Sequence, residues 1–222
     1  IFFVDLVGLK NFLNMKKFIL ILLIILPSLM FAQIPNDLET PNDIGMAHLL
    51  GIGVEKDYKK AMEWFMISAK DGNEFAQANI GLMYSDGKGV KQDYKKAAEW
   101  FSKSAIQGNA SAQTSLGYLY DHGKGVELNY KEAVRLYRLA ADQGYPVAQR
   151  NLGFAYKNGT GVNADLTYAL MWFFIANTDD LEQSGGIALK EAKKLIETLN
   201  EEEINKAAQM VSDCFAKNFK GC

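Results

Sequence analysis

A spacing of 36 residues recurs through the middle of the chain and limits what it can fold into. Four glycines stand at this spacing; each is followed by valine and preceded, two positions earlier, by another glycine. The resulting Gly-x-Gly-Val motifs begin at Gly51, Gly87, Gly123 and Gly159. A fixed period of this length is typical of solenoids, in which each unit buries its apolar face only against its neighbours. The period therefore predicts a stack of similar units.

Each unit contains two segments with helical periodicity. The first begins at a tyrosine and carries apolar residues at helical spacing, as from Tyr94 to Phe101. The second carries Ala-Gln and, four residues after the glutamine, a glycine that recurs as Gly81, Gly117 and Gly153. A glycine inside a helix costs about 1 kcal/mol relative to alanine, so we expect the two helices of a unit to cross closely there. The predicted fold is all-α, a superhelical solenoid of helical hairpins.

The repeated residues also resemble a known family. The string A-Q-x-x-L-G-x-x-Y-x-x-G-x-G-V, followed by x-x-D-Y-x-x-A-x-x-W-[FY], is similar to the Sel1-like repeat (SLR), a relative of the tetratricopeptide repeat. The resemblance covers roughly Ile44 to Ala176. It implies an α/α superhelix that serves as a protein-interaction scaffold and carries out no chemistry of its own.

The N-terminal part has the pattern of an export signal. Met15 is followed by Lys16 and Lys17, and then by an apolar run that leads to Ala32. A basic, an apolar and a small-residue region in this order predict a secretory signal peptide over 15–32, with a periplasmic or secreted mature chain. An uncleaved membrane anchor is the alternative. We interpret residues 1–14 as an upstream extension that precedes the natural start.

The remaining boundaries follow the repeats. Residues 33–50 are expected to form a linker and a half-repeat, and 51–186 the full repeats. Residues 187–222 are expected to form two capping helices, the second opened by a capping box at Asn200 and Glu203. The apolar face of this last helix is expected to carry Ile204, Ala207, Ala208, Val211 and Phe215. Within the repeats, the tryptophans Trp64, Trp100 and Trp172 are predicted to be core residues.

Several function classes are disfavoured. A formal net charge of −2 offers no electrostatic basis for nucleic-acid binding. The two histidines, His48 and His122, have no cysteine or second histidine at metal-ligand spacing, so we expect no metal and no other cofactor. No Ser-His-Asp or Cys-His arrangement can be assembled, and the chain is not expected to be an enzyme.

Cys214 and Cys222 are the only cysteines. An even count in an exported chain favours a disulfide. The cysteine-rich branch of the SLR family carries cysteines at this same separation of eight residues, so the resemblance also implies the pairing. Two free thiols remain the alternative.

A second apolar column points to a binding surface. Leu82 lies about 200° from Ile80 on a helical wheel, opposite the core stripe. In tetratricopeptide-like stacks this face lines the concave groove, which suggests a site for an extended peptide or a partner helix. The equivalents of Leu82 are Met46, Tyr118 and Phe154, and the expected neighbouring groove residues are Phe75, Ser111, Thr114, Asp121, Arg150 and Lys157. The alternative is that neighbouring helices bury the column.

The sequence thus predicts an exported scaffold or adaptor that binds a protein or peptide partner through its concave face. Two other functions remain open. Some cysteine-rich SLR proteins are described as binding or slowly hydrolysing β-lactams, which by resemblance suggests a cell-wall or β-lactam ligand. The third hypothesis is a purely structural, self-associating solenoid.

Overall fold

The computed structural model describes residues 40–176 and 184–222. These residues form helices and no strand, which confirms the all-α prediction. The helices are α2 (Pro41–Leu50), α3 (Tyr58–Lys70), α4 (Glu74–Asp86), α5 (Tyr94–Ile106), α6 (Ala110–His122), α7 (Tyr130–Ala141), α8 (Pro146–Asn158), α9 (Leu166–Ala176), α10 (Ser184–Ile196) and α11 (Glu201–Ala216). The predicted upstream extension and signal peptide lie outside the described residues.

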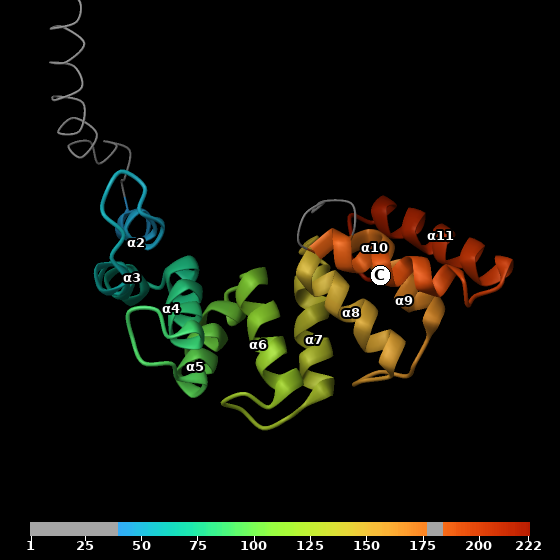
Figure 1. Cartoon of the computed structure of the whole chain (residues 1–222), viewed down its shortest axis with the longest axis horizontal. Coiled ribbons are helices and arrows are strands. Elements are labelled where there is room, and N and C mark those ends of the chain that lie inside the picture. Colours follow the sequence, from blue (N-terminus) through green and yellow to red (C-terminus); the bar gives the residue numbers. More distant parts are fainter. Residues whose placement is uncertain (1–39, 177–183) are drawn as a thin grey trace, which may run out of the picture. The chain divides into compact units, whose positions relative to one another are not determined.

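The chain divides into two compact units, 1–64 and 65–222. In its described part, the first unit contains α2 and the beginning of α3. In the second unit the helices pack most closely in consecutive pairs, α4 with α5, α6 with α7, and α8 with α9 (Figure 1). Each of these pairs is a hairpin closed by a Gly-x-Gly-Val loop. No helix in the described ranges is long and apolar enough to cross a membrane.

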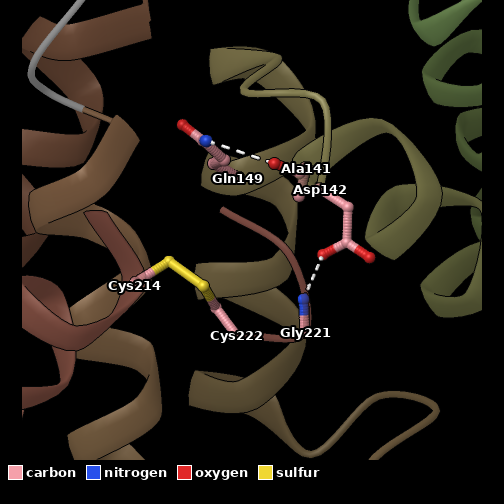
Figure 2. Close-up of a disulfide and its surroundings, with 6 residues drawn as sticks. All are labelled: Ala141, Asp142, Gln149, Cys214, Gly221 and Cys222. Atoms are coloured by element: carbon pink, nitrogen blue, oxygen red, sulfur yellow. Dashed lines mark hydrogen bonds between the residues drawn. A yellow bond between two sulfur atoms is a disulfide. The ribbon is translucent and has the colours of Figure 1, made fainter. Parts of the chain in front are cut away.

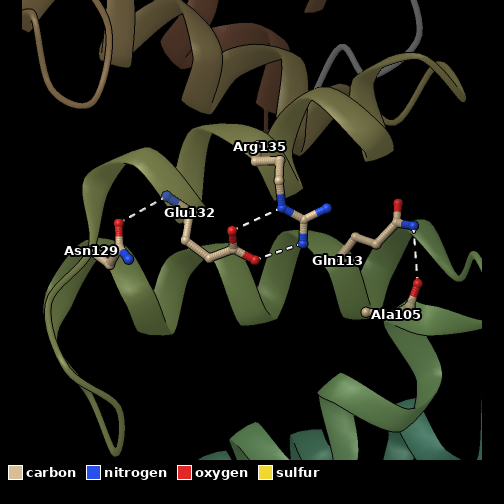
Figure 3. Close-up of polar contacts among 5 residues, drawn as sticks. All are labelled: Ala105, Gln113, Asn129, Glu132 and Arg135. Atoms are coloured by element: carbon tan, nitrogen blue, oxygen red, sulfur yellow. Dashed lines mark hydrogen bonds and ion pairs between the residues drawn. The ribbon is translucent and has the colours of Figure 1, made fainter.

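Short polar side chains begin the helices where the sequence places them. The Asn129 side chain accepts a hydrogen bond from the Glu132 backbone N–H at the start of α7, at 3.0 Å (Figure 3). Asp93, Asn73 and Asn109 cap their helices in the same way. Asn200 and Glu203 form the predicted capping box of α11. Each cap satisfies a backbone N–H that lacks a partner within the helix.

The glycines inside the helices mark the closest helix crossings, but with a different partner from the one predicted. A Cβ added to Gly81 would lie 2.5 Å from the ring of Phe101, and one on Gly153 would lie 2.5 Å from the ring of Phe173. Gly117 meets Tyr137 in the same way, at 2.7 Å. In each case the ring belongs to the helix after the Gly-x-Gly-Val loop. The expected crossing within a unit is therefore wrong, because the glycine faces the first helix of the next unit.

The second glycine of two loops brings the loop against the preceding hairpin. Gly125 and Gly161 have φ of +70° and +75°, which side chains other than glycine rarely adopt. A Cβ at either position would also lie 2.3 Å from the backbone of Tyr94 or Tyr130, the first residue of the preceding hairpin's second helix. Each of these loops therefore packs, backbone to backbone, on the beginning of that helix.

Glutamine side chains link the same hairpins on their buried side. The Gln113 amide nitrogen donates to the Ala105 carbonyl at 3.2 Å (Figure 3). Its amide oxygen accepts from Gln143 at 2.9 Å. The pattern recurs between Gln107 and Gln77 at 2.8 Å, and between Gln149 and the Ala141 carbonyl at 3.4 Å (Figure 2). The recurring Ala-Gln pair thus satisfies the carbonyls at the end of a buried helix.

The C-terminal segment closes the second unit. Cys214 and Cys222 form a disulfide, as predicted (Figure 2). The loop that it closes is fastened to the turn between α7 and α8, where the Gly221 N–H donates to the Asp142 carboxylate at 3.4 Å. Closing a loop of this size contributes about 2–3 kcal/mol in the chain-entropy description.

Two expectations about the core need correction. Trp172 is buried, but Trp64 and Trp100 are only half-buried, and Lys103 lies over the Trp100 ring at 4.2 Å. On α11, Ala207 is buried, whereas Ala208 and Phe215 are exposed.

We expect Gly153→Ala to destabilise the second unit by about 1–3 kcal/mol, because the added methyl overlaps the Phe173 ring. Gly186→Ala in α10 is the matched control, since a Cβ there meets no atom within 4 Å. It should be neutral or stabilising by up to about 1 kcal/mol. Urea unfolding of both variants measures the difference, and equal effects would contradict the close crossing at Gly153.

Candidate functional site

A groove of about 720 Å³ lies over the helices α4, α6 and α8 of the second unit. Leu82, Tyr118 and Phe154 of the predicted apolar column line it, together with Thr114, Asp121 and Arg150. The sequence did not place several other lining residues in the groove. These include Phe101, Ser115, His122, Tyr130, Val134, Tyr137, Asn151 and Asn158.

Four expected residues do not line the groove. Met46 lies in α2, which belongs to the other unit. Phe75 is 58% exposed at the beginning of α4, and Ser111 stands at the equivalent end of α6; neither reaches the groove lining. Lys157 forms an ion pair with Glu191 of α10, which draws its side chain toward the C-terminal helices.

The apolar column is only partly exposed. Leu82 and Tyr118 are 39% and 40% exposed, whereas Phe154 is half-buried. The Phe154 ring packs edge-on against Phe173 of α9, with the centroids 5.1 Å apart. The column therefore offers two exposed apolar side chains, Leu82 and Tyr118, while Phe154 also belongs to the core.

Tyr118 is held in place by the end of its own helix. The His122 ring lies 4.1 Å from it, between centroids. Lys124 donates a hydrogen bond to the Tyr118 hydroxyl at 2.9 Å, and this bond raises the pKa of Lys124 above its ordinary value. A side chain that is already ordered loses little conformational entropy when a ligand packs on it.

Tyr137 places a buried hydroxyl at the groove. It comes from α7, is 2% exposed, and its hydroxyl makes no hydrogen bond within the described part of the chain. Burial raises the pKa of Tyr137 well above its usual range; Asp121 adds to the rise, while the Asn151 side chain beside the hydroxyl and the charge of Arg150 oppose it. The hydroxyl thus stays protonated, and almost none of its surface is open to solvent. The signal in the sequence was a tyrosine where Phe101 and Phe173 occupy the equivalent positions.

Two charged residues complete the polar part of the groove. Burial raises the pKa of Asp121, while His122, 3.6 Å away, opposes that shift. Arg150 is half-buried and takes part in no ion pair or hydrogen bond across residues 40–176 and 184–222. Those ranges also hold no group of acidic, histidine or cysteine side chains arranged to bind a metal. The groove combines apolar contacts with hydrogen-bond donors, an arrangement suited to binding.

The repeats match a known family. The profile of the Sel1 repeat matches residues 42–73, 75–109, 110–145 and 146–177, which is more than half of the chain. The chain belongs to the Sel1 repeat family. The second to fourth matches correspond to the hairpins α4–α5, α6–α7 and α8–α9 of the structure. No curated protein matches the chain.

Two solved SLR structures are similar to it. One is c5321, described as a protective antigen present in uropathogenic Escherichia coli strains; it matches with a TM-score of 0.74 and 31% identity over 80% of this chain and 38% of that one. The other is a Sel1 repeat protein from Oxalobacter formigenes, with a TM-score of 0.60 and 30% identity over 82% of this chain and 78% of that one. The chain thus spans well under half of the E. coli protein.

Tyr137→Phe is expected to leave the second unit as stable as before or to stabilise it by about 1–3 kcal/mol. The change removes a buried hydroxyl that lacks a partner and introduces the residue found at Phe101 and Phe173. Thermal and urea unfolding measure the effect. A clear loss of stability would show that the hydroxyl has an internal partner.

Proposed function

We propose that this SLR protein is a non-enzymatic scaffold that binds a peptide segment or a helix of a partner protein in the groove of its second unit. The supporting observation is the exposure of Leu82 and Tyr118, which come from equivalent positions of successive repeats and line one groove. Large apolar side chains that recur on an open surface are typical of protein-binding sites.

The geometry favours an elongated ligand over a compact one. The helices α4, α6 and α8 all contribute to the lining, together with residues of α5 and α7, so a bound segment meets a new hairpin at each repeat. Tyr118 is fixed by His122 and Lys124, and a rigid aromatic side chain with a polar tip is a frequent energetic centre of protein interfaces. Recognition of an extended segment or of one face of a helix uses regularly spaced anchors of this kind.

The disulfide supports a location outside the cytoplasm. Disulfides persist in oxidising compartments and are rare where thiols are kept reduced. The bond between Cys214 and Cys222 thus agrees with the export signal expected over 15–32. The similar E. coli protein is described as a protective antigen, and export of the present chain would agree with that description.

The groove can be tested with a Leu82→Ala, Tyr118→Ala double variant. Phe154 is left intact because it also packs on Phe173. Ile106→Ala is the matched control, since Ile106 is 84% exposed and lies outside the groove. In a pull-down from the extracytoplasmic fraction, we expect recovery of a specific partner to fall about tenfold with the double variant and to be unchanged with the control. Equal recovery by a folded double variant would place the binding site elsewhere.

The extracytoplasmic location can be tested through the oxidation state of Cys214 and Cys222. Intact cells are treated with a permeant alkylating reagent before lysis, and the chain is then analysed by mass spectrometry. We expect Cys214 and Cys222 to be unmodified until a reductant is added, because they are joined in an oxidising compartment. Alkylation of both cysteines without reductant would contradict the extracytoplasmic location.

A further inference from the structure

The apolar face of α11 is wider than the part of it that the fold buries. Ala207 and Cys214 are buried where α11 packs along α9. Beside them lie four apolar residues that are half-buried or exposed, which we call the outer seam: Ile204, Ala208, Val211 and Phe215. Their spacing of four, three and four residues is that of the contact positions in a pair of packed helices. The outer seam thus has the pattern of a helix contact, yet part of every side chain in it remains open to solvent.

The largest residue of the outer seam is held in place from behind. The Phe215 ring is 42% exposed and packs edge-on against Phe219, with the centroids 5.3 Å apart. The Phe219 ring lies at the turn between α7 and α8, where a Cβ on Gly144 would be 3.3 Å from it. The disulfide between Cys214 and Cys222 closes the loop that carries Phe219. An aromatic side chain that is fixed in this way loses little conformational entropy on binding and is a frequent energetic centre of interfaces.

The two ends of α11 carry opposite charges. Glu201 and Glu202 begin the helix, and Lys217 and Lys220 follow its last residue. All four are exposed, and none takes part in an ion pair across residues 40–176 and 184–222. An antiparallel copy of α11 would place each acidic beginning beside a basic end, whereas a parallel copy would place like charges together. The charges of α11 are therefore complementary to those of a second copy in one orientation.

The outer seam is complementary to itself in the same orientation. A two-fold axis halfway along the helix would bring Ile204 of one copy opposite Phe215 of the other, and Ala208 opposite Val211. The smallest side chain, Ala208, would then lie near the centre of the contact, where it allows the two helices to approach closely. Contacts that repeat in this reciprocal way are those of a two-fold symmetric dimer.

We propose that the chain forms a homodimer in which α11 packs antiparallel on α11 of a second copy through the outer seam. None of the residues that line the groove belongs to α11, so both grooves stay open in the dimer. Two grooves on one particle can hold a partner that carries two binding segments more tightly than either groove alone. This inference goes beyond the proposed function and does not depend on it.

The contact is short, which predicts a weak dimer. Helix α11 has 16 residues and is about 24 Å long. Two helices of this length bury less surface than the roughly 1,600 Å² of a standard interface. We therefore expect a dissociation constant in the micromolar range.

Sedimentation equilibrium of the native chain, purified with its disulfide intact, tests the dimer at concentrations from about 1 µM to 1 mM. We expect a conversion from monomer to dimer and no larger species, because a two-fold contact closes on itself. Ala208→Glu should raise Kd about tenfold or more, because it places two carboxylates at the centre of the contact. Gln209→Glu is the matched control, since Gln209 is also exposed but lies about 100° further round the helix. Its Kd should equal that of the native chain.

The orientation is tested by reversing the charge of one helix end at a time. One variant carries Glu201→Lys and Glu202→Lys, and the other carries Lys217→Glu and Lys220→Glu. Each variant alone should dimerise about three- to tenfold more weakly, because both of its ends then face like charges. An equimolar mixture should recover the native affinity, which also requires that both variants are folded. In a parallel dimer like charges face each other before and after the reversal, so neither variant would be weakened.

The possible results separate clearly. A chain that remains monomeric up to about 1 mM, assembly beyond the dimer, or a dimer that Ala208→Glu leaves intact would overturn the inference. A dimer that Ala208→Glu weakens but the charge reversals do not would overturn the antiparallel arrangement. None of these results bears on the groove, which the Leu82→Ala, Tyr118→Ala variant tests separately.

Discussion

The architecture of the second unit depends on contact between an aromatic ring and a helix backbone at Gly81, Gly117 and Gly153. The absence of a Cβ lets the ring of the following helix lie against the peptide backbone, where it is removed from water and closely packed. This contact sets how near the two helices of a hairpin approach. It also decides which helices pair, and therefore which faces remain for the groove. At one of the three crossings the ring is that of Tyr137, so the contact that stabilises the hairpin also buries a hydroxyl.

Periodicity in the sequence predicted the helices, their caps and the loops, because these depend on residues close together in the chain. The pairing of Cys214 and Cys222 was predictable since there was no other cysteine to choose. The aromatic ring that packs on Gly81 was not predictable in this way. Phe65 precedes this glycine and Phe101 follows it at similar separations, and both are phenylalanines at equivalent positions. Only the three-dimensional packing distinguishes the two.

The sequence predicted which helix face lines the groove, but not which residues complete the lining. A helical wheel places Leu82, Tyr118 and Phe154 on the face opposite the core stripe, and all three line the groove. It cannot show that Phe154 is covered by Phe173, because that contact comes from a neighbouring helix. Nor does the wheel identify Tyr137, which belongs to the core stripe and reaches the groove from beneath. A polar variant of a core residue in one repeat was the available signal.

The stacking of Gly125 on the start of α5, and of Gly161 on the start of α7, has a consequence for how such a chain can change during evolution. Each of these loops is in backbone contact with the start of a helix in the hairpin before it, so one inserted or deleted residue would shift the next hairpin out of this contact. Addition or loss of an entire 36-residue period leaves every such contact intact. The family can therefore lengthen or shorten in whole units, while the spacing inside a unit stays fixed. A duplicated copy of α6–α7 would bring its own contact between Gly117 and Tyr137 and would extend the stack by one unit.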